Sequence, residues 1–289
     1  MSATAITAPA ASPFRLALAR FRRHRSGRVG FLLVAGFIVI ALAAPLLAPD
    51  STLATSWTAI REAPSFAHWM GTDEIGRDEL SRVIWGARAS LAAGVVSVLI
   101  AGLIGVPAGV LAGFAGGWTD RVLSRLVDAM LAIPFLILAI ALAAFLGPNL
   151  RNAMIAIGVS SAPVFMRIAR AATLDTMTLD FIEAARAVGN PPWRVAWVHV
   201  VPNITAPVLV QATLSIATAI IAEASLSFLG LGEQPPQPSW GSMLNAAQQF
   251  LTQAPWLAIF PGIAIFLAVL GFNLMGDGLR DVLDTRRRG

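Results

Sequence analysis

The stretch DFIEAARAVGNPPWRVAWVHVVPN, residues 180–203, is the polar and turn-rich segment around which the rest of the chain is organised. Its first half predicts a short helix. Asp180 is expected to cap that helix by accepting hydrogen bonds from the backbone N–H groups of the first turn, and Glu183 follows three residues later, as in a capping box. Gly189 is expected to end the helix in the left-handed conformation.

The second half of the stretch predicts another short helix, at a sharp angle to the first. Asn190 is the expected N-cap, Pro191 takes the first helical position, and Pro202 ends the helix. Long apolar runs flank the stretch on both sides, so we expect it to present the surface that meets a water-soluble partner. An ordinary loop between membrane spans is the alternative, whereas a DNA-reading helix-turn-helix is not expected between two spans.

The composition indicates an integral membrane protein. Of the 289 residues, 56% are hydrophobic and only 13% are charged, whereas soluble domains have about 25% charged residues. The absence of cysteine excludes disulfides and thiolate metal sites. The absence of lysine excludes a phosphate-binding P-loop, so any ATP must be hydrolysed on another subunit. The net charge of +5 is attributed to membrane topology rather than to nucleic-acid binding.

Six apolar segments are long enough to cross a hydrocarbon core of about 30 Å, which predicts an all-α membrane protein. They occupy residues 29–49, 90–115, 127–147, 152–172, 205–230 and 255–275. The five later segments contain an internal proline, namely Pro107, Pro134, Pro163, Pro207 and Pro261. We expect neighbouring helices to satisfy the backbone groups that these prolines free. The first segment follows a basic arm, as in a secretory signal peptide. It exceeds the usual apolar region of about 7–15 residues, so we interpret it as a retained span.

The arginines indicate how the spans are oriented. Sixteen of the 21 lie in segments that share a side with the N-terminus, so both termini and the 180–203 loop are predicted to be cytoplasmic. No separate soluble domain is expected. The predicted parts are a cytoplasmic basic arm (1–28), a first span (29–49), an extracytoplasmic segment (50–89), a core of five spans (90–276) that includes the polar loop 175–203, and a cytoplasmic basic tail (277–289).

The extracytoplasmic segment ends in GTDEIGRDELSRVIWGARASL, residues 71–91, which predicts an amphipathic helix leading into the second span. Asp78 and Arg82 can pair on its face at a spacing of four residues. The nearby acids lack the alternating oxygen ligands of a calcium loop, so we interpret them as a solvated face rather than a cation site. These acids are Asp73, Glu74, Asp78 and Glu79.

The second span carries a ridge of small residues, spaced four apart, along which another helix backbone can approach closely. Internal packing and an interface with another subunit explain this ridge equally well. The ridge comprises Ala93, Ser97, Ala101, Gly105, Gly109, Gly113 and Gly117.

The fifth span holds polar residues that are candidates for a translocation path, namely Gln211, Ser215 and Glu223. A charge within a span is expensive, which favours a function for Glu223. Because Glu223 lies near the outer end of its span, reaching water or pairing with an arginine is an alternative for its carboxylate, and the other two residues can simply bond between helices.

Residues 183–202 resemble the signature of permease subunits of bacterial ABC importers, the EAA motif. That signature reads Glu-Ala-Ala, three residues, Gly, nine residues, then Ile-x-Leu-Pro. The chain matches it at Glu183, Ala184, Ala185, Gly189 and Pro202. It departs at His199 and Val201, although histidine is common at that place in the peptide-importer branch.

Three further stretches resemble the second permease of dipeptide, oligopeptide and nickel importers, the dipeptide permease C type. They are HWMGTDEIGRDELSRVIWGARASL (68–91), EASLSFLGLGEQPPQPSWGSML (223–244) and NLMGDGLRDVLDTRRRG (273–289). The resemblance runs from about residue 67 to the end and is weaker through the first span. Thr285 stands where the family usually has proline, which affects only the tail.

The resemblance implies a type I ABC importer permease in the bacterial cytoplasmic membrane. It also implies a second homologous permease, two ATPase subunits that bind ATP and Mg²⁺, and an extracytoplasmic substrate-binding protein. The chain itself would be embedded in the lipid bilayer. It would bind no nucleic acid, metal or cofactor, and it would contain no catalytic residue. Its coupling unit, docked on an ATPase subunit, would comprise Asp180, Glu183, Ala184, Ala185, Gly189, Asn190, Pro191 and Pro202.

Two other classes of protein compete with this interpretation. A secondary transporter or channel would need an ion-coupling constellation, but only Glu223 and scattered hydroxyls are present, and no inverted repeat is apparent. A membrane enzyme would need a motif such as H-E-x-x-H or G-x-S-x-G, which the chain lacks, and its three histidines, at 24, 68 and 199, are far apart in sequence. Peptides are the expected substrate, with nickel or another small solute as the alternative.

Overall fold

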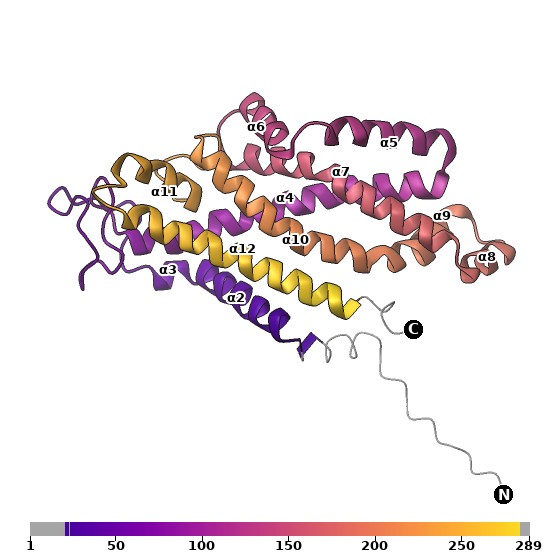
Figure 1. The fold of residues 1–289 in the computed structure, drawn as a ribbon, viewed down its shortest axis with the longest axis horizontal. Helices are drawn as coiled ribbons and strands as arrows, with labels where there is room; N and C mark the ends of the chain where they lie inside the picture. The colour runs from indigo at the N-terminus through magenta and orange to yellow at the C-terminus, as the bar shows by residue number, and fades with distance from the viewer. Residues whose placement is uncertain (1–20, 23, 284–289) are drawn as a thin grey trace, which may run out of the picture.

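The computed structural model describes residues 21–22 and 24–283, which form a bundle of long helices lying side by side (Figure 1). Most of the predicted basic arm and the end of the basic tail lie outside the described residues. The helices are α2 (Arg25–Leu42), α3 (Ala44–Leu47), α4 (Glu79–Ala115), α5 (Gly117–Leu131), α6 (Phe135–Leu146), α7 (Leu150–Met177), α8 (Asp180–Ala187), α9 (Pro192–Arg194), the π-helix η1 (Val195–Val200), α10 (Val201–Phe228), α11 (Trp240–Ala247), the 3₁₀ turn η2 (Gln248–Phe250) and α12 (Trp256–Leu283).

Five helical stretches are long and apolar enough to cross a membrane, and the bent pair α5 and α6 makes a sixth if it counts as one span. The six predicted spans therefore each have a counterpart. Several helices differ from the predicted apolar runs at their ends. The first begins earlier, at Arg25, and α2 ends at Leu42, where the short α3 takes over. Helix α4 starts at Glu79 and α7 continues to Met177, because polar residues prolong the helices beyond their apolar centres.

The third predicted span, 127–147, is not one straight helix. Helix α5 ends at Leu131, α6 begins at Phe135, and their axes meet at 90°. Pro134 explains the break, because it has no N–H to donate and disfavours the helical conformation in the residue before it. The other four span prolines remain inside helices.

Ion pairs hold α5 against α7. Arg170 of α7 pairs with Asp120, and Arg167 pairs with Asp128 at an N–O distance of 3.0 Å. These acids lie on one side of α5, which is amphipathic, so the helix turns its acidic side to the arginines of its neighbour. Helix α5 consequently runs alongside α7 (Figure 1), and α6, beyond the bend, packs on α7 through an apolar cluster that includes Ala143 and Ala153.

The small-residue ridge of α4 packs against α7 of the same chain. A side chain at Gly105, Gly109 or Gly113 would collide with α7, including its backbone. Glycine thus allows the two helices to touch along their backbones. Because α7 covers these three glycines, the ridge contributes internal packing at this point. The nearest side-chain atoms to an added Cβ are, respectively, Phe165 Cβ at 2.7 Å, Ala169 Cβ at 2.7 Å and Thr173 Cβ at 2.9 Å.

The first and last spans also lie side by side, as Figure 1 shows for α2 and α12. An added Cβ on Gly27 would lie 3.2 Å from Gly278 Cα, so glycine again permits close approach. An ion pair at 3.0 Å between His24 Nε2 and Asp281 Oδ2 joins the same two helices near their ends. The first described span is therefore fixed to the last one.

The segment between α3 and α4 folds as a loop over the start of α4. The predicted amphipathic helix begins only at Glu79, because Asp78 is the N-cap and accepts from the Ser81 N–H at 2.8 Å. The predicted pair of Asp78 with Arg82 is wrong. Arg82 Nε lies 3.4 Å from Asp73 Oδ2 instead.

The acids of this segment do not form the solvated face that we expected. Asp73, Asp78 and Glu79 are buried, with exposed fractions of 2%, 4% and 2%. Arg77 pairs with both Asp73 and Glu74 and offsets part of their charge. The loop encloses its charged groups because it folds back on itself and on the first turn of α4. Helical periodicity in the sequence does not predict contacts between such distant segments.

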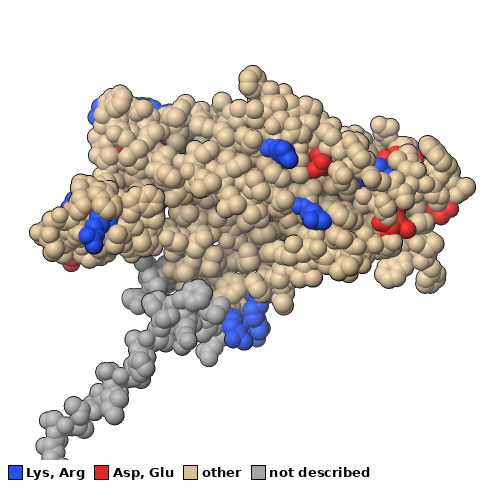
Figure 2. Space-filling view, turned by 180° about the vertical axis from the view of Figure 1, so that it is seen from behind, with Lys and Arg blue, Asp and Glu red and all other residues tan. Residues whose placement is uncertain are grey.

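The outside of the bundle is mainly uncharged. Figure 2 shows a broad surface without acidic or basic groups along much of the bundle, and acidic residues gathered at the end that carries the loop between α3 and α4. Large apolar side chains are exposed on the spans, among them Leu99 and Leu103 of α4 and Phe266 of α12. Such a surface suits lipid, which does not require polar side chains.

Candidate functional site

The 180–203 unit extends from one end of the bundle as two connected arms (Figure 1). The first arm is α8. Its N-cap is Leu179, and no side chain caps it, so the predicted capping by Asp180 is wrong. Asp180 and Glu183 instead lie in the first turn, where carboxylates stabilise the positive end of the helix dipole.

Helix α8 has one buried and one exposed face. Ile182 and Ala185 are buried, and Ile182 belongs to an apolar cluster with Ala169 of α7 and with Val195, Val200 and Ile204 of the second arm. Glu183 and Ala184 are exposed on the other side. The first arm is therefore attached firmly to the protein and still presents a small residue and an acid outward.

Gly189 ends α8 as predicted, with φ of +85°. Its N–H donates to the Arg186 carbonyl at 2.9 Å, and the Asn190 N–H donates to the Ala185 carbonyl at 3.3 Å, which is the Schellman pattern. Asn190 is not the N-cap of the next helix. Its Nδ2 donates to the Ala185 carbonyl at 2.9 Å, and Pro191 occupies the N-cap position instead.

The second arm is not a short helix closed by Pro202. Helix α9, the π-helix η1 and α10 follow each other without a break, and Pro202 lies in the first turn of α10. Proline donates no hydrogen bond, and the π-helical turn before it shifts the backbone pairing so that the chain continues. The second arm and the fifth span are therefore one helical element.

The unit exposes large apolar side chains. The exposed fraction is 83% for Val188 at the turn and 66% for both Trp193 and Trp197 on the second arm. Such groups at a protruding turn are typical of a surface that binds another protein. None of these three residues was predicted from the sequence as part of the binding surface, although two tryptophans within a short polar stretch are a usable signal.

Gln211 and Ser215 line a cavity of about 330 Å³ beside the break between α5 and α6. Gln211 Nε2 donates to Ser215 Oγ at 2.9 Å. Ser160, Ser161 and Thr218 add hydroxyl groups to the wall, and no charged residue is part of it. The cavity can therefore offer hydrogen bonds without selecting the charge of a solute.

Glu223, by contrast, does not line this cavity. It is fully buried, and it accepts from Ser227 Oγ at 2.7 Å and Ser90 Oγ at 3.0 Å. Its carboxylate does not reach the solvent-exposed surface, and no arginine among the described residues pairs with it, so both alternatives that the sequence suggested are wrong. The same Ser90 hydroxyl accepts from the Trp240 backbone N–H at 3.4 Å, so the Glu223 carboxylate connects α4, α10 and the start of α11.

A second glutamate, Glu233, lies in the loop that follows α10, where burial raises the pKa of its carboxyl group.

These contacts predict that shape and hydrogen bonding matter more than charge at Glu223. Glu223→Gln should retain uptake, because an amide oxygen can still accept from a serine. Glu223→Leu should lower thermal stability, since each hydroxyl left unpaired costs about 1–3 kcal/mol. Thermal inactivation and solute uptake of both variants check this, with Ser225→Ala as a control on the same helix. Lost uptake at normal stability in Glu223→Gln would show that the carboxylate itself is required.

Comparison with known proteins connects this geometry to a family. Residues 105–289 match the family described as "Binding-protein-dependent transport system inner membrane component", and residues 12–64 match the "N-terminal TM domain of oligopeptide transport permease C". A dipeptide transport system permease protein, DppC, of Alkalihalophilus pseudofirmus is 45% identical over 96% of this chain and 92% of its own length. A glutathione transport system permease protein, GsiD, of Pectobacterium atrosepticum is 44% identical over 95% of this chain and 92% of its own length.

A solved structure supports the same fold. A chain of the MetNI methionine ABC transporter, in an inward-facing conformation, superposes with a TM-score of 0.59 at 24% identity. The match covers 70% of this chain and 96% of that one. The family match spans well over half of the sequence and includes the 180–203 unit. The chain belongs to the family of inner-membrane components of binding-protein-dependent transport systems.

Proposed function

We propose that this chain is a permease subunit of an ATP-driven importer that moves dipeptides or short oligopeptides into the cytoplasm. The two relatives described above are named as transporters of a dipeptide and of glutathione, which is itself a tripeptide. Membership of the family makes the chain a transport component and not an enzyme. ATP and Mg²⁺ are assigned to two partner ATPase subunits, and a second homologous permease completes the pair.

The observation that carries this proposal is the geometry of the 180–203 unit, which exposes a binding surface and is packed against two long helices. The exposed Ala184 and the apolar groups at Val188 and Trp193 give an ATPase subunit a surface to hold. The buried Ile182 ties this surface to α7 and to the second arm. A force applied by the partner therefore reaches two long helices at once. Coupling further requires that the two ATPase states contact this surface differently.

The proposed orientation places the 180–203 unit and both termini in the cytoplasm. The arginine distribution supports it, because positive residues accumulate on the cytoplasmic side of short loops. The loop between α3 and α4 then lies outside, where an extracytoplasmic binding protein delivers the substrate.

The uncharged cavity beside the α5–α6 break is the proposed contribution of this chain to the path. A peptide carries backbone amide groups whatever its side chains are, and Gln211 and Ser215 offer a matching donor and acceptor. The path formed with the second permease would thus accept different peptides, and the binding protein would set the choice.

Uptake by cells tests the proposed substrate directly. A strain that lacks this gene should lose import of a labelled dipeptide and regain it when the gene is restored, while accumulation of labelled nickel stays unchanged. Purified complex should hydrolyse ATP only when the ATPase subunits are present. Restored nickel import without dipeptide import would replace peptides by nickel as the substrate. Transport that continues without the ATPase subunits would remove the importer mechanism.

A further inference from the structure

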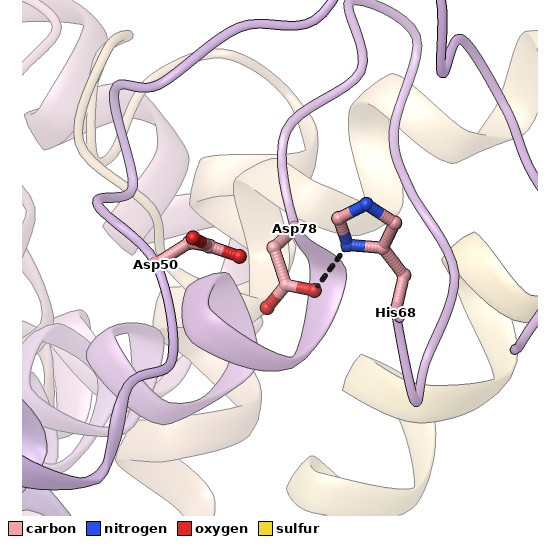
Figure 3. A group of neighbouring side chains, drawn as sticks. All are labelled: Asp50, His68 and Asp78. Carbon is pink, nitrogen blue, oxygen red and sulfur yellow. Dashed lines mark hydrogen bonds and ion pairs between the residues drawn. The ribbon is translucent and has the colours of Figure 1, made fainter. Parts of the chain in front are cut away.

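Asp50, His68 and Asp78 come together at the end of the bundle that carries the loop between α3 and α4 (Figure 3). Asp50 follows α3, His68 lies within the loop, and Asp78 is the N-cap of α4. One ligand atom from each residue lies within 4.8 Å of the other two. Positions far apart in sequence thus converge on one point.

Asp78 is held in a fixed orientation. Its Oδ2 accepts from the Ser81 N–H at 2.8 Å and from Ser81 Oγ at 2.7 Å. Its other oxygen, Oδ1, lies 3.0 Å from His68 Nδ1. A separation of about 3 Å fits a hydrogen bond, and it equally fits two neighbouring ligands bound to one metal ion at about 2.1 Å. The pair is therefore already spaced for shared coordination.

Asp50 supplies an observation that a simple histidine–aspartate pair does not explain. Its backbone N–H donates to Ser81 Oγ at 3.0 Å, which fixes the residue beside Asp78. Its carboxylate points toward Asp78 (Figure 3) and forms no hydrogen bond or ion pair with any described residue. The nearby arginines, Arg77 and Arg82, are paired with other acids. Two carboxylates therefore face each other, and among the described residues the only basic side chain paired with either of them is His68, beside Asp78.

We infer that Asp50, His68 and Asp78 form a site for one divalent transition-metal ion, with zinc as the best match. A divalent ion bound to two carboxylates and a neutral imidazole leaves the site with no net charge. Zinc binds nitrogen and carboxylate oxygen at about 2.0–2.2 Å, and water completes its four ligands. The Asp50 side chain is exposed, and coordination would require it to move closer to the other two ligands.

The donor set decides which class of metal is expected. Magnesium and calcium prefer sites made only of oxygen ligands, whereas an imidazole suits zinc and its neighbours. The three ligands come from the end of the first span, the loop and the start of the second span, so the ion would cross-link these segments. This differs from the sequence expectation of no bound metal. The three residues are far apart in the sequence, so their closeness in the folded protein could not be predicted from it.

Metal binding by the full-length chain, purified with its partner permease, tests this inference. After chelator treatment and removal of the chelator, the wild-type protein should rebind about one zinc per chain, as measured by elemental analysis, and excess Mg²⁺ should not displace it. Asp50→Ala and His68→Gln should each weaken zinc binding at least about tenfold. The loop should also become more sensitive to protease without zinc.

His24→Gln is a matched control, because His24 forms a histidine–aspartate pair with Asp281 that has no third candidate ligand among residues 21–22 and 24–283. It should keep the zinc. Asp50→Ala removes a side chain with no described hydrogen bond, so the variant should fold normally by circular dichroism and gel filtration. Absence of zinc from the rebound wild-type protein would overturn the inference. Equal zinc in folded Asp50→Ala and wild type would overturn it as well.

Discussion

Replacing Gly189 with proline is expected to abolish uptake while the protein stays inserted in the membrane. Gly189 has φ of +85°, whereas proline fixes φ near about −65°. The substitution also removes the N–H that donates to the Arg186 carbonyl. The turn must then follow another path, and α8 loses its angle to the second arm. An added Cβ at Gly189 has no neighbour within 4 Å, so the substitution introduces no clash of that atom with the rest of the bundle.

Membrane vesicles that contain the whole importer allow both halves of this expectation to be measured. Dipeptide uptake should fall at least about tenfold in Gly189→Pro, which corresponds to about 1.4 kcal/mol of lost coupling. ATP hydrolysis should no longer respond to the loaded binding protein. Gly189→Asn is the control, because asparagine tolerates the left-handed conformation, and it should keep most of the uptake. Normal uptake in Gly189→Pro would contradict the proposed coupling role.

The second large effect is expected from Gly109→Ala, and it concerns folding. An added Cβ on Gly109 would collide with the Met166 carbonyl of α7 and would lie 2.7 Å from Ala169 Cβ and 2.9 Å from the Arg170 backbone nitrogen. Backbone atoms cannot move aside as a flexible side chain can, so α4 and α7 must separate. Overpacking of this kind costs about 1–3 kcal/mol.

Gly102→Ala is the matched control, because it lies on the same helix and has nothing within 4 Å of an added Cβ. Alanine forms helix better than glycine by about 1 kcal/mol, so this variant should be as stable as the wild type or more stable. Thermal unfolding of the detergent-solubilised proteins, monitored by gel filtration, separates the two outcomes. Equal melting temperatures would mean that the α4–α7 contact is looser in the membrane.

The sequence predicted features that depend on local or strictly periodic patterns. Apolar length located the spans, and a glycine between a helix and a polar turn located the end of α8. The four-residue spacing of Gly105, Gly109 and Gly113 also predicted close approach of another helix. The pattern could not tell whether that helix belonged to this chain, because a helix ridge carries no information about its partner.

The features that sequence analysis missed depend on contacts between distant segments or on a choice between similar local structures. Asp180 and Leu179 can both precede the first turn, and the capping rule alone chose the wrong one. Pro202 looked like a helix end, but the π-helical turn before it accommodates the missing N–H. Asp73 is buried, and Asp50 lies near His68, because of how the loop between α3 and α4 folds. An irregular loop has no repeating sequence pattern from which such contacts can be predicted.

The continuity of the second arm with α10 has a geometric consequence. The helical stretch from Pro192 to Phe228 contains 37 residues, which at 1.5 Å per residue makes a rod about 55 Å long. A tilt of about five degrees at the end that carries the 180–203 unit would displace the far end by about 5 Å. Glu223 lies near that far end and ties the rod to α4 and α11. Under the proposed coupling role, a small rotation of the 180–203 unit would therefore be transmitted over this length to the far end of α10 and to the helices tied to it there.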